Sequence, residues 1–323
     1  MMNITNSYRR YALTLNEINN YAKHDPKGFV ETSESAYRSD IKEIARSITE
    51  DKDKCRVILL AGPSASGKTT TAKMLNEEFE KIGCGSEIIS MDNFYLGEKC
   101  VPKTVDGKPD FETVNALNIP KIEQCISNLL EYGWADIAQF DFASSTPLEE
   151  TIRINLHNES IAIIEGIHAL NPIFTEHIRS RAGLKKIYIS VKQGIRKKPV
   201  SGYMLTAAEL RLMRRIVRDC KFRGSNADHT MGMWENVLLG EKKYITPYKY
   251  TGDITINSLH IYEPCVIASK TIPYMSKVEK SSPEYEYARY LIERAEQFCC
   301  IDESLIPDNS LLREFLGNSK YKY

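Results

Sequence analysis

A glycine-rich loop near residue 62 contains the residue types that bind phosphate oxygens. Gly62 and Gly67 enclose four residues and are followed by Lys68 and Thr69. Glycines at this spacing let the backbone turn tightly and direct its N–H groups at an anion, while the lysine adds positive charge and the threonine a hydroxyl ligand for Mg²⁺. The loop therefore predicts that the chain binds a nucleoside triphosphate with Mg²⁺. The residues expected to contact the nucleotide here are Gly62, Ser64, Ala65, Ser66, Gly67, Lys68, Thr69 and Thr70.

The segments on either side of the loop provide the context that the motif requires. An apolar, β-branched run predicts a strand over residues 56–61, and apolar residues at helical spacing predict a helix over residues 68–82. The alternative is a glycine-rich turn that happens to carry a surface lysine. The flanking pattern argues against it, because a phosphate loop joins a buried strand to a helix.

Two acidic residues are expected at the edge of the sheet that carries this loop. Asp92 follows a predicted strand at residues 86–90, and Glu165 ends an apolar run at residues 160–165. Ligands of open α/β sheets bind at the carboxyl ends of the strands. Asp92 could accept the proton of an incoming hydroxyl group or hold Mg²⁺ through water, and Glu165 could join the metal ligands. The alternatives are that Asp92 only caps the next turn and that Glu165 is an isolated acid.

Several arginines recur at helical spacing in a predicted helix at residues 206–222. Arg211, Arg214, Arg215 and Arg218 are expected to share one face of this helix. Guanidinium groups aligned in this way suit a lid that closes on a phosphoryl group and offsets its negative charge during transfer. A solvated basic helix, or a face that docks a partner, is the alternative interpretation.

The other predicted elements indicate an α/β sandwich. Further strands are expected at residues 185–191 and 253–257. The strands alternate with helices, and the apolar runs within residues 56–61 and 160–165 are unbroken, a pattern typical of a buried parallel sheet with right-handed crossovers. The predicted fold has three layers with a central parallel sheet, a helical lid and extra helical segments at both ends. Further helices are expected at residues 33–48, 115–132, 230–242 and 283–300, and an extended loop at residues 193–205.

Length and composition limit the class of protein. The chain has 323 residues, 42% of them hydrophobic, and 43 basic residues balance 43 acidic residues, so neither nucleic acid nor an anionic membrane is expected as a partner. There is no apolar run long enough to cross a membrane, no signal-peptide pattern at the start and no C-x-x-C pair among the eight cysteines. We therefore expect a cytoplasmic protein with reduced thiols.

These motifs, in this order, resemble those of the uridine kinase and phosphoribulokinase family. The resemblance covers about residues 55–270, between an N-terminal helical extension at 1–54 and a C-terminal helical extension at 271–323. Besides the phosphate loop it rests on Ser90-Met-Asp-Asn-Phe-Tyr95, Asp106-Gly-Lys-Pro-Asp110-Phe, Ile164-Glu-Gly-Ile-His168 and the arginine-rich segment 211–223. It implies a P-loop kinase that transfers the γ-phosphoryl group of ATP, with Mg²⁺, to a hydroxyl group of a nucleoside or related small molecule.

The resemblance also implies roles for individual residues. The catalytic residues would be Lys68, Asp92 as general base, Arg218 and Arg223, and the nucleotide would also contact Arg214 and Arg215. Mg²⁺ would be held by Thr69, Asp92 and Glu165. The acceptor would contact Asp92, Tyr95, Asp110, Phe140 and Arg211. The partner is thus a small hydroxyl compound, and the chain could form a homo-oligomer.

One departure from the family concerns the acceptor. Uridine kinases have Tyr-Asp-Phe followed by a histidine, whereas this chain has Phe140-Asp141-Phe142 followed by Ala-Ser-Ser145. A site without that phenol and imidazole should bind a different base, or none. A nucleoside is the first expectation, and a pentose phosphate, pantothenate or another hydroxyl compound is the alternative. A nucleotide-dependent switch or binding protein is disfavoured. The sequence lacks Asn-Lys-x-Asp, with which GTPase switches bind guanine, and Ser-Gly-Gly-Gln, the signature of transporter ATPases.

Overall fold

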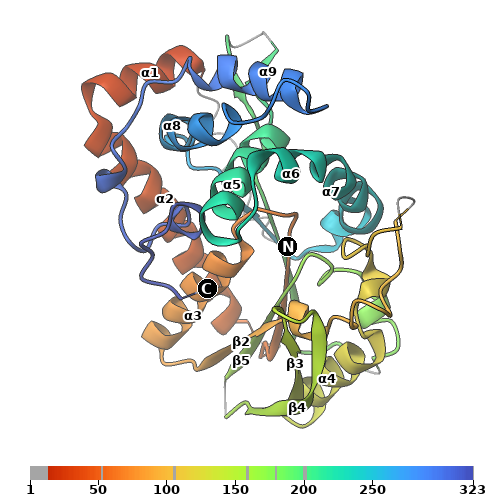
Figure 1. The fold of residues 1–323 in the computed structure, drawn as a ribbon. Helices are drawn as coiled ribbons and strands as arrows, with labels where there is room; N and C mark the ends of the chain where they lie inside the picture. Colours follow the sequence, from red (N-terminus) through yellow and green to blue (C-terminus); the bar gives the residue numbers. More distant parts are fainter. Residues whose placement is uncertain are drawn as a thin grey trace.

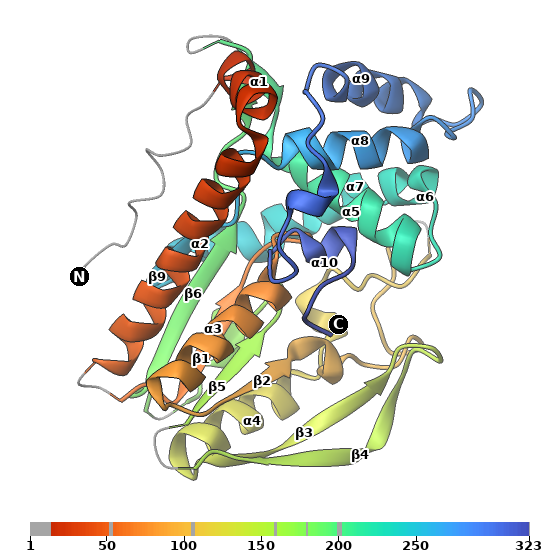
Figure 2. The same ribbon diagram turned by 90° about the vertical axis from the view of Figure 1, so that its left-hand side faces the viewer.

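Five parallel strands form the central sheet of the computed structural model, which describes residues 14–51, 54–104, 107–157, 160–178, 180–198 and 202–322. The strand order is β2-β5-β1-β6-β9 (Figures 1 and 2). Their bounds are Val57–Ala61 for β1, Ser86–Ser90 for β2, Ile161–Glu165 for β5, Leu184–Ser190 for β6 and Ile254–Asn257 for β9. The predicted α/β fold is confirmed, and all five strands lie within about one residue of their predicted positions.

The sheet is buried between helices on both of its faces. In β1 the side chains of Ile58 and Leu60 join the apolar core on one face, whereas Val57, Leu59 and Ala61 join the core on the other. The first face is covered by α2 (Pro26–Thr49), α3 (Lys68–Ile82), α5 (Ala207–Phe222) and α8 (Pro264–Met275). The second is covered by α4 (Ile119–Glu131). Burial on both faces explains the continuously apolar strands.

Glycines determine where the chain turns from β1 into α3. Gly67 (φ 84°) and Gly83 (φ 85°) have left-handed conformations at the two ends of α3. A Cβ atom at Gly62 would lie 2.1 Å from the Ile189 carbonyl oxygen, so only glycine allows β6 to approach this closely. The phosphate loop is therefore held against the carboxyl end of β6.

The N-terminal segment contains more helix than the sequence predicts. α1 (Leu15–His24) is capped by Thr14 and Glu17, and α2 begins at Pro26 rather than near residue 33. Asp25 caps α2 through the Gly28 N–H at 2.9 Å, and proline favours the first helical position. α2 packs along the first face of the sheet, and α1 lies beyond the end of the sheet and contacts α2 and α8 (Figure 2).

Two antiparallel strands form a hairpin outside the central sheet. The sequence pattern does not indicate this hairpin. It pairs β3 (Trp134–Asp141) with β4 (Thr146–Asn155), and Figure 2 shows it below the main sheet. A smaller hairpin of β7 (Ile195–Arg196) and β8 (Tyr203–Leu205) lies in the segment predicted as an extended loop. Residues 199–201 of that segment, and Asp106 of the motif above, lie outside the described residues.

The remaining elements are short. The helix predicted at 230–242 is divided into α6 (Ala227–Gly232), α7 (Trp234–Gly240) and the π-helical turn Glu241–Ile245, and the helix predicted at 283–300 is α9 (Tyr285–Ala295). α10 (Arg313–Leu316) is the last helix of the described chain. The 3₁₀ turns are Met91–Phe94, Val114–Ala116, Pro172–Phe174, Thr246–Thr251 and Glu303–Leu305. No helix in the described part of the chain is both long and apolar enough to span a membrane.

Candidate active site

The phosphate loop forms a concave turn of backbone N–H groups. Ala65 (φ 56°) and Gly67 (φ 84°) are both left-handed, and the Ser66 N–H donates to the Pro63 carbonyl at 3.2 Å. The Ser66 hydroxyl is buried and has no hydrogen-bond partner among the described residues. Because successive N–H groups in such a turn converge on one point, the loop is built to hold an anion.

A cavity of about 650 Å³ opens beside this loop at the carboxyl ends of β2 and β5. Five residues predicted from the sequence line it: Thr69, Asp92, Glu165, Arg218 and Arg223. Two carboxylates, a hydroxyl group and two guanidinium groups from four separate segments therefore surround one space. Grouped around one cavity, these side chains could provide the charges and the proton acceptor that phosphoryl transfer needs.

Burial alters the acidity of the charged groups around the loop. Burial lowers the pKa of Lys68, an effect that the nearby carboxylates of Glu165, Glu314 and Asp92 oppose. Burial raises the pKa of Asp92, and it raises that of Glu165 to about 7. Lys68 donates a hydrogen bond to the Pro63 carbonyl at 3.3 Å. A poorly solvated region of this kind strengthens interactions between charges.

Two arginines of α5 are positioned against the loop and the cavity by a shared aspartate. Arg215 donates to the Ser64 hydroxyl at 3.0 Å and to Asp219 at 3.2 Å. Arg218 donates to the other oxygen of Asp219 at 2.8 Å. Asp219 therefore fixes the guanidinium groups of two neighbouring helical turns and keeps Arg218 at the wall of the cavity.

The structure corrects the prediction that Arg214 contacts the nucleotide from the lid face. Its side chain is fully buried, with two bonds to Glu263 at 2.5 and 2.6 Å. Its other donors contact the Ser258 carbonyl at 2.8 Å and the Ala65 carbonyl at 3.2 Å. All of these partners lie within the protein, so Arg214 supports the back of the phosphate loop and leaves no donor for phosphate.

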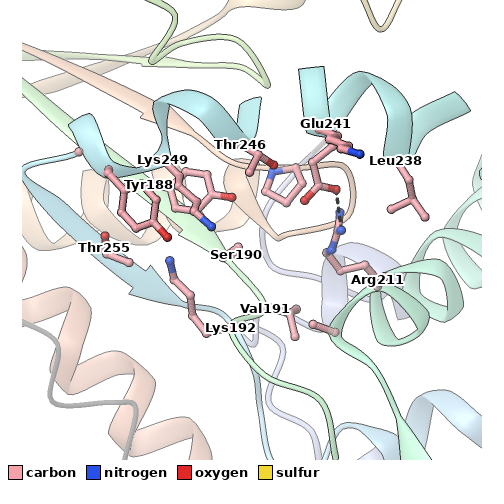
Figure 3. A pocket seen from close by; sticks show the side chains of 16 residues that line it. Tyr188, Ser190, Val191, Lys192, Arg211, Leu238, Glu241, Thr246, Lys249 and Thr255 are labelled. Atoms are coloured by element: carbon pink, nitrogen blue, oxygen red, sulfur yellow. Dashed lines mark hydrogen bonds and ion pairs between the residues drawn. The ribbon is translucent and has the colours of Figure 1, made fainter. Parts of the chain in front are cut away.

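Arg211 is also placed differently from its prediction as an acceptor ligand. It donates to Glu241 at 2.7 Å and to the Ser64 carbonyl at 3.1 Å. Its side chain lines a second cavity of about 680 Å³ that also contacts Tyr188 and Lys192 (Figure 3). Arg211 is not among the described residues that line the first cavity, the one that contains Asp92 and is called the Asp92 cavity below. This geometry therefore does not favour a direct contact between Arg211 and an acceptor bound at Asp92.

The aromatic residues predicted to hold the acceptor, Tyr95 and Phe140, are not among the described residues that line the cavity. Tyr95 donates to the Phe111 carbonyl at 3.3 Å and packs edge-on against Phe140, with 6.0 Å between ring centroids. Phe140 is buried, whereas Phe142 is 62% exposed and lines the cavity. Phe142, in the turn that follows β3, therefore lines the cavity, whereas Phe140 is not among the described residues that line it.

Asp110, the predicted ligand of sugar hydroxyl groups, lies in the turn behind Tyr95. Its carboxylate accepts a hydrogen bond from the Glu112 N–H at 3.0 Å, and it is not among the described residues that line the Asp92 cavity. In the described conformation Asp110 shapes its own turn. Its contact with an acceptor remains a prediction.

His168 is a buried polar group that the sequence did not assign to any role. It is 1% exposed, and neither ring nitrogen has a hydrogen-bond partner within the described residues. The ring packs edge-on against Tyr244, with 5.9 Å between centroids. Burial lowers the pKa of His168 to about 4, so the imidazole is neutral near pH 7.

The neutral imidazole predicts a pH dependence of stability. His168 binds a proton more readily in the unfolded chain, whose histidine pKa is about 6.5, so folding is favoured above that pH and loses stability as the pH falls toward 4. We expect the loss to reach up to roughly 3 kcal/mol. We would measure the free energy of unfolding with urea at several pH values. This free energy should depend less steeply on pH in His168→Gln than in wild type, whereas the exposed His229→Gln should keep the wild-type dependence on pH. An unchanged pH dependence in His168→Gln would contradict the assignment.

Several residues that line the cavity come from parts of the chain without a recognisable motif. The C-terminal residues Arg313, Glu314 and Tyr321 belong to its wall. The sequence predicts a C-terminal extension that packs on the core, but no spacing of residues there indicates a contact with a loop more than 240 positions earlier. Only the three-dimensional structure reveals it.

Comparisons with known proteins show which family this chain resembles. The model of the phosphoribulokinase / uridine kinase family matches residues 57–263. The uridine kinase of Bacillus pumilus is 30% identical over 207 residues, which cover 62% of this chain and 85% of that protein. For the uridine kinase of Lactobacillus helveticus the identity is 29% over 208 residues, with the same coverage of both chains.

Among solved structures, D-glycerate 3-kinase from Cryptococcus neoformans aligns with 68% of this chain and with 87% of the residues of that kinase. The two are 14% identical in sequence, and the TM-score is 0.39. The family match is the decisive finding, because it extends from β1 to Glu263 and includes the phosphate loop, Asp92, Glu165 and the arginine-rich helix. Since the match spans more than half of the residues, the chain belongs to the phosphoribulokinase / uridine kinase family of kinases.

Proposed function

We propose that this kinase transfers the γ-phosphoryl group of ATP to a hydroxyl group of a nucleoside. The main support is that Asp92 shares one cavity with Thr69 of the phosphate loop and with Glu165, Arg218 and Arg223. A carboxylate beside the phosphate-binding groups suits transfer to a bound hydroxyl group, which must lose its proton. The nucleoside is supported by the relatives named uridine kinase, at 29–30% identity.

The phosphate loop fits the triphosphate of ATP. The buried Ser66 hydroxyl lacks a partner within the described residues, and the left-handed Ala65 and Gly67 direct backbone N–H groups inward. The Thr70 N–H, in the first turn of α3, donates a hydrogen bond to a carboxylate oxygen of Glu314 at 3.2 Å, which supports this position as one that suits an anion.

Mg²⁺ fits the oxygen atoms of the same cavity. Thr69, Asp92 and Glu165 provide a hydroxyl group and two carboxylates, which are the hard ligands that Mg²⁺ prefers beside substrate phosphates. When bound there, the ion would neutralise negative charge on the phosphate oxygens. The Ser90 hydroxyl donates to Glu165 at 3.1 Å and so fixes the orientation of this carboxylate.

The protein groups then divide the work of the transfer. Lys68 holds the outer phosphates, and Asp92 accepts the proton of the acceptor hydroxyl group as that oxygen attacks the γ-phosphorus atom. Burial raises the pKa of Asp92, which makes its carboxylate a stronger base. Arg218 and Arg223 at the wall of the cavity offset charge on the transferring group, and Phe142 helps to exclude water.

The proposal is tested by ADP release from ATP–Mg²⁺ across a panel of nucleosides, pentose phosphates and pantothenate. We expect turnover with a nucleoside well above the rate without acceptor, and the panel identifies its base. If only a compound that is not a nucleoside supports turnover, the proposed acceptor is wrong and the proposed kinase reaction still holds. Equal ADP release with and without every acceptor would contradict the proposed kinase activity.

A further inference from the structure

The C-terminal part of the chain crosses the mouth of the phosphate loop. We call residues 303–322 the C-terminal strap; it includes α10, which lies beside the amino end of α3 in Figure 2. Leu311, Leu312 and Phe315 of the strap are fully buried. The strap is thus part of the folded core and not a loose tail.

The strap places one carboxylate on the donors of the phosphate loop. Glu314 Oε2 accepts a hydrogen bond from the Thr70 hydroxyl at 2.6 Å and from the Thr70 N–H at 3.2 Å. Thr70 is the third residue of α3, so its N–H is one of the first-turn donors that no helical carbonyl can satisfy. Such donors, together with the positive end of the helix dipole, are the ones that bind phosphate.

A second residue of the strap covers the loop at the same place. A Cβ atom at Gly67 would lie 2.5 Å from Leu311 Cδ1, so the leucine side chain rests directly on this glycine. Gly67 precedes Lys68 and begins the helix that Thr70 continues. Leu311 and Glu314 therefore cover both sides of the helix terminus, one with an apolar group and one with a negative charge.

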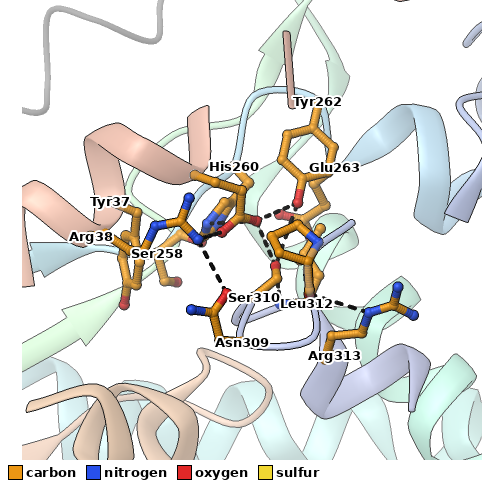
Figure 4. Close-up of polar contacts among 12 residues, drawn as sticks. Tyr37, Arg38, Ser258, His260, Tyr262, Glu263, Asn309, Ser310, Leu312 and Arg313 are labelled. Carbon is orange, nitrogen blue, oxygen red and sulfur yellow. Dashed lines mark hydrogen bonds and ion pairs between the residues drawn. The ribbon is translucent and has the colours of Figure 1, made fainter. Parts of the chain in front are cut away.

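Contacts with helices on both sides hold the strap in this position. The Ser310 hydroxyl donates to Glu34 of α2 at 2.6 Å, and Arg38 of α2 donates to Asn309 at 3.2 Å (Figure 4). Farther along, Lys320 pairs with Glu77 of α3 at 2.6 Å. The strap is thus anchored before and after α10, and the half-buried side chain of Glu314 can leave Thr70 by its own rotation while the anchors stay in place.

We infer that Glu314 is an autoinhibitory group, whose carboxylate occupies a phosphate position of the loop and must leave before a nucleotide binds there. The inference rests on the proposed function, since it concerns the same nucleotide site. The N–H and hydroxyl groups of Thr70 cannot bind the Glu314 carboxylate and a phosphate at the same time. A phosphate placed beside this carboxylate would also be repelled by its negative charge. Nucleotide affinity is therefore set partly by the strap.

The test is a calorimetric titration of ADP–Mg²⁺ into wild type, Glu314→Gln and Glu314→Ala. Removing a charge-assisted competitor should tighten ADP binding by roughly 10- to 100-fold in Glu314→Ala, with a smaller gain in Glu314→Gln, which keeps the size but not the charge. Asp308→Ala is the matched control, because Asp308 is an exposed carboxylate of the same strap. Its affinity should equal that of wild type.

Hydrogen exchange provides a readout that does not depend on activity. ADP–Mg²⁺ should increase amide exchange in residues 311–317 of wild type, because the nucleotide displaces Glu314 and loosens α10. Wild-type affinity in both Glu314 variants, or increased protection of these amides, would overturn the inference while leaving nucleotide binding intact. If wild type and both variants fail to bind ADP–Mg²⁺ although thermal melting shows them folded, the proposed function fails together with the inference.

Discussion

We expect the Asp92→Asn variant to lose roughly two to four orders of magnitude in the rate of phosphoryl transfer while it still binds the nucleotide, because Thr69 and Glu165 remain to hold Mg²⁺. Asparagine has nearly the same shape as aspartate but cannot accept the proton of the acceptor hydroxyl group. Asp92 lines the cavity beside Thr69 and Glu165, and burial already raises its pKa. The loss should therefore appear in kcat more than in the binding of either substrate.

Single-turnover kinetics with saturating ATP and acceptor measure this effect directly. Asp308→Asn is a suitable control, because it removes an exposed carboxylate outside the Asp92 cavity. A turnover of Asp92→Asn within a few-fold of wild type would show that another group takes the proton, and would remove Asp92 from the mechanism.

The second large effect is expected for Lys68→Met. Lys68 is the only residue of the loop motif with a charged side chain, and it lies within the electrostatic influence of Glu165, Asp92 and Glu314. Methionine retains the length of the side chain and removes the ammonium group. We expect kcat to fall by about two to three orders of magnitude, the usual effect of removing one group that stabilises charge in the transition state.

This variant should also bind ATP–Mg²⁺ more weakly, unlike Asp92→Asn. Lys81→Met tests for nonspecific effects, because Lys81 belongs to the same helix but is exposed and paired with Glu78. Calorimetry and steady-state kinetics together separate the two expectations. Normal kinetics in Lys68→Met would contradict a role for this loop in phosphate binding.

The sequence predicted those parts of the fold that depend on local patterns. β2 and α3 begin and end where they were expected, because an apolar run and flanking glycines determine their limits. The hairpin of β3 and β4 was not predicted. Nearly all of β4 is exposed, so it lacks the regular alternation of apolar and polar residues that identifies a strand packed on a core.

The site was predicted where its residues follow strands or belong to the phosphate loop. Asp92 and Glu165 meet because parallel strands end at the same edge of a sheet. Arg214 was misplaced, because its spacing with three other arginines resembles an exposed face and its partner Glu263 lies 49 residues away. A buried ion pair of this kind depends on tertiary contacts, which no local pattern contains.

The contact of Glu314 with Thr70 is a still longer-range case. The two residues are 244 positions apart, and neither belongs to a pattern that would connect them. The sequence predicts only that the C-terminal extension packs on the core, and the structure shows that Leu311, Leu312 and Phe315 are buried there. Their burial positions Glu314, and the chemistry of this position appears only when α10 is placed beside α3.

The most direct test of the central claim is to follow the γ-phosphorus atom of ATP by ³¹P NMR in the presence of Mg²⁺ and the nucleoside that the acceptor panel identifies. We predict that the phosphorus signal moves from ATP to a phosphate ester of the nucleoside, at a rate that Asp92→Asn reduces by at least a hundredfold. Appearance of the signal only as inorganic phosphate, at the same rate with and without nucleoside, would show hydrolysis instead of transfer and would contradict the account.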